Sequence, residues 1–225
     1  MARPRFYRIL EYPFVYNTAG MILAPGARRL TGQVYRRLFE NSRGMVLDIG
    51  CGPRLRTPEP NGIVVGVDVN PDYLRSYTGG IVDDDPDVFV DDPGERTRFA
   101  YLGGAEELPF RSHLFDEVRC RAMLHHIPPD GARAIIQEGI RCLRPCGKFV
   151  IIDCIWPRTA CFRPIAWLIH RCDRGEWIRT QEELTELAES ATGSPWQSLR
   201  YTSAYNGLEE LALTYEKPAA LRLVA

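Results

Sequence analysis

The sequence lacks long apolar runs and has no excess of basic residues. In a chain of 225 residues with a formal net charge of −1, the longest apolar stretches are too short to span a bilayer, and no global field favours nucleic acid. The N-terminal stretch also lacks the apolar core and small-residue cleavage site of a secretory signal. These absences predict a cytoplasmic protein with no integral membrane segment and no nucleic-acid partner, of a length that suits one α/β domain.

Metal-ligand spacing is absent as well. The seven cysteines include no C-x-x-C pair, and no His-x-His pair accompanies them, so no zinc site is predicted. The acidic stretch from Asp83 to Glu95 lacks the alternating Asp spacing of a calcium loop, and we expect it to be a solvated loop. We therefore expect no bound metal, and we interpret the cysteines as reduced thiols.

One stretch near residue 50 carries the clearest chemical signal. Val46-Leu47-Asp48-Ile49 has the pattern of a buried strand, and it ends in Gly50-Cys51-Gly52, a turn that lets a bound molecule approach the backbone. A second apolar run, residues 63–67, ends in Asp68. A strand, a glycine turn, a second strand and a terminal carboxylate form the front half of a nucleotide-type site, where the acid binds the two ribose hydroxyls.

Residues 46–52, together with Val65-Gly66-Val67-Asp68-Val69, resemble the first two motifs of class I S-adenosylmethionine-dependent methyltransferases, closest to the UbiE-like, small-molecule (type 11) branch. Later segments follow in the family's order: Ala105-Glu106-Glu107-Leu108-Pro109-Phe110, Phe115-Asp116-Glu117-Val118 and Leu124-His125-His126-Ile127. The resemblance implies S-adenosyl-L-methionine as cofactor and methyl transfer to a small, aromatic or apolar acceptor. The sequence does not specify an oligomeric state.

The chain departs from the family pattern in several places. Arg54 replaces the third glycine of the loop, and prolines 53, 58 and 60 prevent a normal helix in the first crossover. Gly104 stands where the family has an Asp that binds adenine, and Cys146 replaces the first glycine of a later turn. These departures leave an alternative open, a methyltransferase-like binding or partner subunit without catalysis. An RNA methyltransferase is disfavoured, because the chain has no basic face and no Asn/Asp-Pro-Pro motif after the fourth strand.

The predicted fold is a doubly wound, mostly parallel seven-stranded sheet of the Rossmann-like methyltransferase type. Beyond the two strands above, we expect strands at 98–102, 115–121 and 149–153, and a final hairpin of 196–203 and 208–216 with its last strand antiparallel. Helices are expected at 71–78, from an N-cap at Asp130 to Leu143, and from a capping box of Thr180 and Glu183 to about Ser190.

The resemblance also implies the division of the chain. Residues 1–43 would be a helical lid, and residues 44–225 the methyltransferase domain, with a cap insertion at about 154–179. Packing of the first segment on the sheet edge, and its contact with a membrane surface, stay open as alternatives.

By the same resemblance, ten residues would bind the cofactor. Its methionine portion would lie beside Asp48, Gly50, Cys51 and Gly52, and near the backbone of Arg121. Asp68 would bind the ribose hydroxyls. The adenine would lie against Val69 and be flanked by Gly104, Ala105 and Glu106.

Histidine is the natural group for proton transfer near neutral pH, so His125 and His126 are the catalytic candidates, although either could simply pack beside the cofactor. In the cap and the lid, aromatic residues could enclose a flat or apolar acceptor, and arginines could bind an acidic group on it or only fix the cap. These substrate candidates are Tyr16, Trp156, Arg174, Trp177 and Arg179.

Overall fold

The computed structural model describes residues 22–53, 55, 61–78, 81–82, 88–90, 98–158, 163–171 and 175–219. Its helices are α2 (Ala27–Phe39), α3 (Pro71–Tyr77), the 3₁₀ turn η2 (Leu124–His126), α4 (Pro129–Cys142), α5 (Pro164–Arg171) and α6 (Gln181–Thr192). Its strands are β1 (Arg43–Ile49), β2 (Asn61–Asp68), β3 (Ile81–Val82), β4 (Val88–Val90), β5 (Arg98–Leu102), β6 (Phe115–Arg121), β7 (Leu143–Ile155), β8 (Gln197–Thr202) and β9 (Glu209–Glu216).

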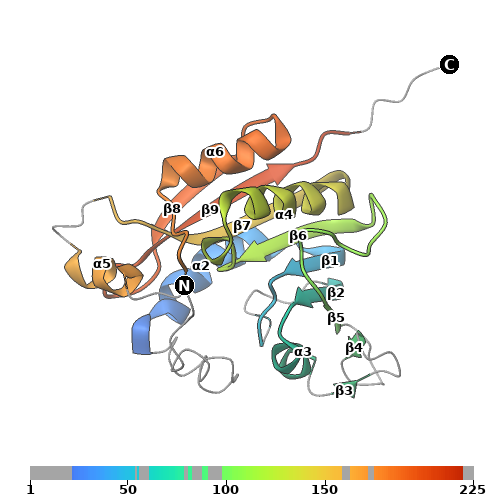
Figure 1. Ribbon diagram of the computed structural model, residues 1–225, viewed down its shortest axis with the longest axis horizontal. Coiled ribbons are helices and arrows are strands. Elements are labelled where there is room, and N and C mark those ends of the chain that lie inside the picture. The colour runs from blue at the N-terminus through green and yellow to red at the C-terminus, as the bar shows by residue number, and fades with distance from the viewer. Residues whose placement is uncertain are drawn as a thin grey trace.

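The strands form one sheet in the order β3-β4-β5-β2-β1-β6-β7-β9-β8 (Figure 1). Strands β5, β2, β1, β6 and β7 are parallel to their neighbours in this central part. Strand β9 is antiparallel to both β7 and β8. The seven strands from β5 to β8 in this order confirm the predicted seven-stranded, mostly parallel sheet with an antiparallel last strand.

Helices cover both faces of the sheet (Figure 1). On one face, α4 and α6 contribute Ile136 and Leu184 to the largest cluster of buried residues, which also contains Phe149 of β7. On the other face, α2 packs Tyr35 against β7 and β9, and α3 packs on β2 and β5. The central strands read as continuous apolar runs because both of their faces are buried in this way.

A buried ionic cluster fixes α2 against β6. The guanidinium Nε of Arg119 lies 2.5 Å from Oε1 of Glu117, and both side chains are almost fully buried. The hydroxyl of Ser42 donates to the second oxygen of Glu117 at 2.7 Å, and Arg119 lies over the ring of Phe39, 4.4 Å from its centroid. The pairing makes burial of both charges tolerable.

The structure differs from the sequence-based elements in three respects. Two short antiparallel strands, β3 and β4, extend the sheet where we expected only a loop, and the acidic residues between and after them lie outside the described residues. Strand β7 begins at Leu143, well before the predicted start, with Cys146 at a φ of 60° inside it. Pro128, not Asp130, occupies the N-cap position of α4, with no side-chain capping bond, because Pro129 with its preset φ occupies the first helical position.

The short first crossover and the capping box agree with prediction. Strand β1 ends at Ile49 and β2 starts at Asn61, and no helix occurs among the described residues between them. Thr180 accepts from the backbone of Glu183, whose side chain accepts from the backbone of Thr180. In the part of the chain that the structure describes, no helix is long and apolar enough to cross a membrane.

Candidate functional site

The glycine turn after β1 is held open by its own backbone. Gly50 and Gly52 both have a φ of 65°, a left-handed conformation that favours glycine. The backbone N–H groups of Gly50 and Cys51 donate to the carbonyl of Val67, at 2.8 and 3.2 Å. A methyl group added at Gly50 would meet Met123, whereas one added at Gly52 would meet nothing within 4 Å. The second glycine therefore borders open space, as a ligand cradle requires.

Asp68 ties this turn to the end of β2. Its Oδ2 accepts from the backbone of Gly52 at 3.0 Å, and its Oδ1 accepts from the backbone of Asn70 at 2.9 Å. Burial raises the pKa of Asp68, and these backbone hydrogen bonds oppose the shift. A carboxylate has about four lone-pair sites, more than these backbone groups use, so Asp68 can also accept from a hydroxyl group of a ligand.

These residues border a cavity of about 640 Å³ at the carboxyl ends of β1, β2, β5 and β6, a size typical of small-molecule and cofactor sites. It is the position at which open α/β sheets bind ligands. The structure brings eight of the predicted site residues to this cavity. They are Gly50, Gly52, Asp68, Val69, Gly104, Ala105, Glu106 and His126.

Three of the predicted cofactor residues do not line the cavity. Asp48 is buried and accepts from the hydroxyl of Tyr77 at 3.2 Å, and burial raises its pKa against the opposing charge of Arg119. Cys51 turns its thiol toward Gly66 of β2, and burial raises the pKa of that thiol well above 9.0. Arg121 is the last residue of β6, and the next residue, Ala122, is the one that borders the cavity.

His125 does not border the cavity. It is bonded to Asp153 instead. Its backbone N–H and its ring Nδ1 approach the two oxygens of Asp153 at 2.9 and 2.5 Å. Burial alone would lower the pKa of His125, but the charge of Asp153 raises it well above 6.5. An imidazolium already has its protons, so this arrangement does not suit His125 to a role as general base. The ring of His126 packs against that of His125 at a tilt of 47°, with centroids 3.9 Å apart, and His126 is the histidine at the cavity.

The cap residues hold the cavity wall without bordering the cavity. Arg179 is buried and donates to the carbonyls of Leu124 and Ile127 at 2.8 and 2.9 Å, so its guanidinium fixes the turn that carries His126. The backbone of Trp177 donates to the carbonyl of His125 at 2.9 Å.

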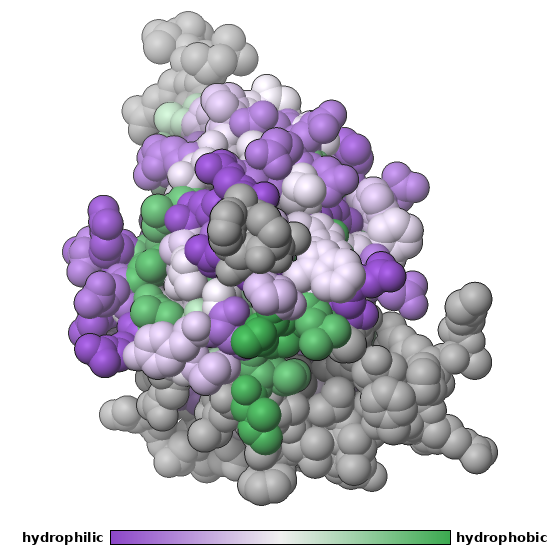
Figure 2. All heavy atoms as spheres, turned by 90° about the vertical axis from the view of Figure 1, so that its left-hand side faces the viewer, coloured by the Kyte–Doolittle hydropathy of each residue, from purple (hydrophilic) through white to green (hydrophobic). Residues whose placement is uncertain are grey.

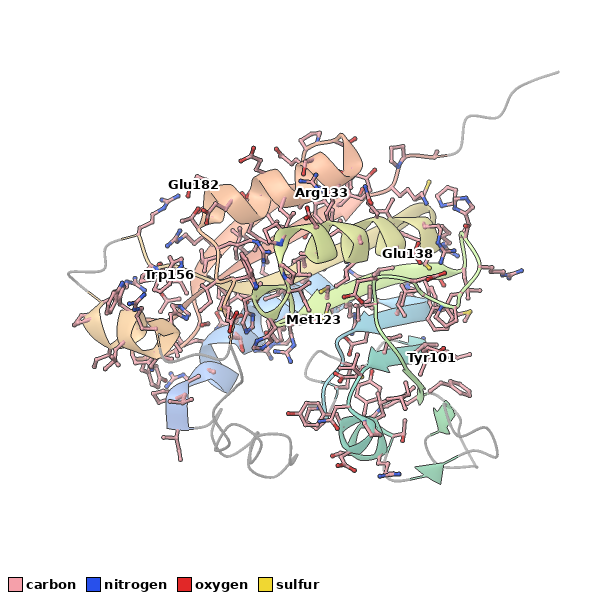
Figure 3. All side chains as sticks on the ribbon, in the orientation of Figure 1. Tyr101, Met123, Arg133, Glu138, Trp156 and Glu182 are labelled. Carbon is pink, nitrogen blue, oxygen red and sulfur yellow. The ribbon has the colours of Figure 1, made fainter. Side chains whose placement is uncertain are left out.

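Trp156 packs its ring against Trp167 and His170 of α5 and donates to the carbonyl of Ile178. Figure 3 shows Trp156 toward α5 and Met123 below the start of α4. The remaining substrate candidates, Tyr16 and Arg174, lie outside the described residues.

Sequence reasoning missed several cavity residues. Asn70 caps α3, since its side chain accepts from the backbones of Asp72 and Tyr73, and all three border the cavity. The sequence Asn70-Pro71 indicates an N-cap, but it does not indicate that this cap borders the site. Met123 and Ile127 form an apolar wall beside His126. Their positions depend on the left-handed φ of 49° at Ala122, which redirects the chain after β6 and has no signal in the sequence.

One group of side chains has metal-ligand chemistry among the described residues. The ligand-type atoms of His125, Asp153 and Cys154 lie within 4.8 Å of one another. Asp153, however, already accepts from the backbone and ring of His125 and from the backbone of Cys154. The hydrogen-bonded ion pair accounts for this cluster without a metal ion.

Known proteins share the sequence and the fold. Residues 47–151 match the sequence model of a family described as a methyltransferase domain. An uncharacterized methyltransferase of Synechocystis is 27% identical over 187 residues, or 75% of this chain and 81% of the relative. A SAM-dependent methyltransferase from Methanosarcina mazei has a TM-score of 0.57 at 16% identity, covering 84% of this chain and 98% of that one. A Haloferax volcanii protein, solved in complex with the Trm112 methyltransferase activator, gives 0.62 at 14% identity, covering 93% and 96%. At such identities the solved structures show the fold alone.

Proposed function

We propose that this chain, an S-adenosylmethionine-dependent methyltransferase whose residues 47–151 are the domain of the type 11 family, methylates a small molecule with an aromatic or apolar body. One observation carries the proposal. The 640 Å³ cavity is lined both by the glycine turn with Asp68 and by the apolar side chains of Met123 and Ile127, of which Met123 lies against Gly50. A polar cofactor and an apolar acceptor would each meet a matching wall.

The cofactor supplies a methyl group already activated on a sulfonium, so the protein needs mainly to orient the acceptor and exclude water. Asp68 would bind the ribose hydroxyls, with Val69 and residues 104–106 along the adenine. The open space at Gly52 would admit the amino-acid portion. Asp48, Cys51 and Arg121 would act through the loop and strand that they support, since none of them borders the cavity.

His126 is the residue we propose for any proton transfer, because it borders the cavity and His125 does not. The acceptor's X–H bond would lose its proton to this ring while X forms its bond to the methyl carbon; the bond from that carbon to sulfur would break, and S-adenosylhomocysteine would leave. An acceptor that ionises in water would not need this help, so the role depends on the acceptor's acidity.

We also propose a role for two segments outside the central sheet. Residues 1–43 would act as a lid, and the segment from 154 to 179 as a cap that holds the turn after β6. The cysteines that the structure describes are free thiols, which suits our proposal of a cytoplasmic location.

Calorimetric titration with S-adenosylmethionine and S-adenosylhomocysteine tests the site. We expect micromolar binding, and about tenfold or more weakening in Asp68→Asn, because hydrogen bonds to charged groups contribute about 1.5–3 kcal/mol. Asp72→Asn is the matched control, since Asp72 also borders the cavity but already pairs with Arg75 at 3.0 Å. Equal affinity in the two variants would contradict our placement of the ribose. Absence of binding at millimolar ligand would favour the alternative, a non-catalytic partner subunit.

A further inference from the structure

Three segments distant in the sequence meet at the end of the molecule toward which the parallel strands point. They are residues 22–26, which precede α2; helix α5; and the turn between β8 and β9 (residues 203–208). The side chain of Asn206 donates to the carbonyl of Leu23 at 2.7 Å, and the backbone of Tyr205 donates to the carbonyl of Pro25 at 2.9 Å. Arg163, just before α5, donates to the carbonyl of Gly207 at 2.8 Å. These bonds join the segments into one surface, which we call the α5 surface.

Large apolar side chains point outward from the α5 surface. They are between 41% and 73% exposed, far more than residues of their type in the core: Ile22, Leu23, Ile165, Trp167, Leu168 and Tyr205. Figure 2, which looks at the left-hand side of Figure 1 where α5 lies, shows hydrophobic residues gathered on this face. Contiguous exposed apolar residues of this extent mark an interaction surface.

The exposed charges that the structure describes on the same surface are basic. Arg29 and Arg171 are exposed, whereas Arg163 is paired with Glu209, with its Nη1 3.5 Å from Oε1. The whole chain has a net charge of −1, so the positive charge is local. Arg171 lies over the ring of Trp167, with its guanidinium carbon 5.6 Å from the centroid. An apolar centre with tryptophan and arginine at its rim matches the boundary between lipid headgroups and acyl chains.

We propose that the α5 surface docks this protein on the surface of an anionic lipid bilayer. Ile165 and Leu168 would enter the headgroup–acyl boundary, and Arg29 and Arg171 would lie among the acidic headgroups. The protein would bind peripherally. Because the surface lies at the same end of the sheet as the cavity, a bilayer-dissolved apolar molecule would have a short path to it. This last step rests on the proposed function, whereas the docking itself does not.

Sedimentation with vesicles tests the docking directly. We expect the full chain to sediment with phosphatidylcholine vesicles that contain phosphatidylglycerol, and far less with phosphatidylcholine alone. The double variant Ile165→Glu/Leu168→Glu should bind at least tenfold more weakly, since it places charges where apolar groups must enter the bilayer. Arg171→Gln should lower binding to the anionic vesicles about fivefold and reduce its salt dependence.

Leu199→Glu is the matched control, because Leu199 is also 40% exposed but lies in the middle of β8, away from this surface. It should bind like the wild type, and S-adenosylhomocysteine affinity should be the same in every variant. The proposal is overturned if the wild type stays in the supernatant at low salt, or if the double variant binds as tightly as Leu199→Glu. It is also overturned if the double substitution instead converts a stable dimer to a monomer. If the wild type does not bind S-adenosylhomocysteine, the proposed function is contradicted, but the result of the vesicle experiment still decides the docking.

Discussion

At the scale of single residues, substitutions of glycine distinguish an effect on stability from an effect on cofactor binding most clearly. Gly52 and Gly193 have nearly the same backbone, with φ of 65° and 66°, and a methyl group at either would meet nothing within 4 Å. Gly52→Ala and Gly193→Ala should therefore each lower the free energy of unfolding by about 1 kcal/mol, the cost of a left-handed alanine. Only Gly52→Ala puts its methyl into the cavity, so only it should weaken S-adenosylhomocysteine binding, by about tenfold. Urea unfolding and calorimetry check both; equal affinities would show that the turn does not contact the cofactor.

Cys146 is a residue in a glycine's conformation. Its φ is 60°, its side chain is exposed, and its N–H donates to the carbonyl of Lys217 at 2.9 Å. Cys146→Gly should raise the free energy of unfolding by roughly 0.5 kcal/mol, because relief of about 1–2 kcal/mol of strain exceeds the entropy that glycine loses on folding. Cys146→Ala keeps the strain and removes the sulfur, so the urea midpoint of that control should barely move. An equal gain in both variants would attribute the effect to the thiol.

At the scale of elements, the hydrogen bonds between the cap and the turn after β6 matter most for function, because this turn carries His126. Arg179 bonds the carbonyls of Leu124 and Ile127, and its own carbonyl accepts from the backbone of Trp156. A lysine has a single ammonium on a flexible stem and does not reproduce the planar fork. Arg179→Lys should therefore cost about 1–3 kcal/mol of unfolding free energy and speed hydrogen exchange in residues 123–128.

Arg200 supplies the control for this link. It donates to the carbonyl of Trp156 and pairs with Glu209, so it holds the same cap to the β8–β9 hairpin without touching the turn. Arg200→Lys should lower stability while exchange at residues 123–128 stays as in the wild type. Equal acceleration in both variants would mean that the cap as a whole, and not Arg179, sets the position of His126.

At the scale of the molecule, the local sequence predicted the elements well and the contacts between them poorly. Strands β5 and β6 have the predicted bounds, and the Thr180 capping box is present, because apolar runs and caps are local patterns. Arg179 was predicted to bind an acidic group of the acceptor or only to fix the cap, and the sequence did not reveal its partners, which are backbone carbonyls more than 50 residues away. His125, in the turn η2, was a candidate base, but its protonation depends on Asp153 of β7. Such distant partners are set by packing, which one sequence does not reveal.

The His125–Asp153 pair makes the stability of the whole molecule depend on pH. The pKa of Asp153 is lowered below 3.8, because its pairing with His125 outweighs the effect of burial. Its stabilisation is therefore present above pH 3.8 and is lost as the pH falls through the folded pKa. The pKa of His125 is raised above 6.5, so its stabilisation is complete below pH 6.5 and is lost as the pH rises through the folded value. Both contributions are complete only between these limits.

Asp153→Asn measures this dependence. Removing one partner of a buried ion pair costs about 3–5 kcal/mol, so we expect a loss of that size in urea unfolding at pH 5. The difference from wild type should persist at pH 7, shrink toward alkaline pH as His125 loses its proton, and shrink again in strong acid. Asp72→Asn breaks an exposed pair with Arg75 and should change the stability by no more than about 0.5 kcal/mol at any pH. If the loss in Asp153→Asn were the same at acid and alkaline pH, His125 would be neutral in the native protein, and it would again be a candidate base.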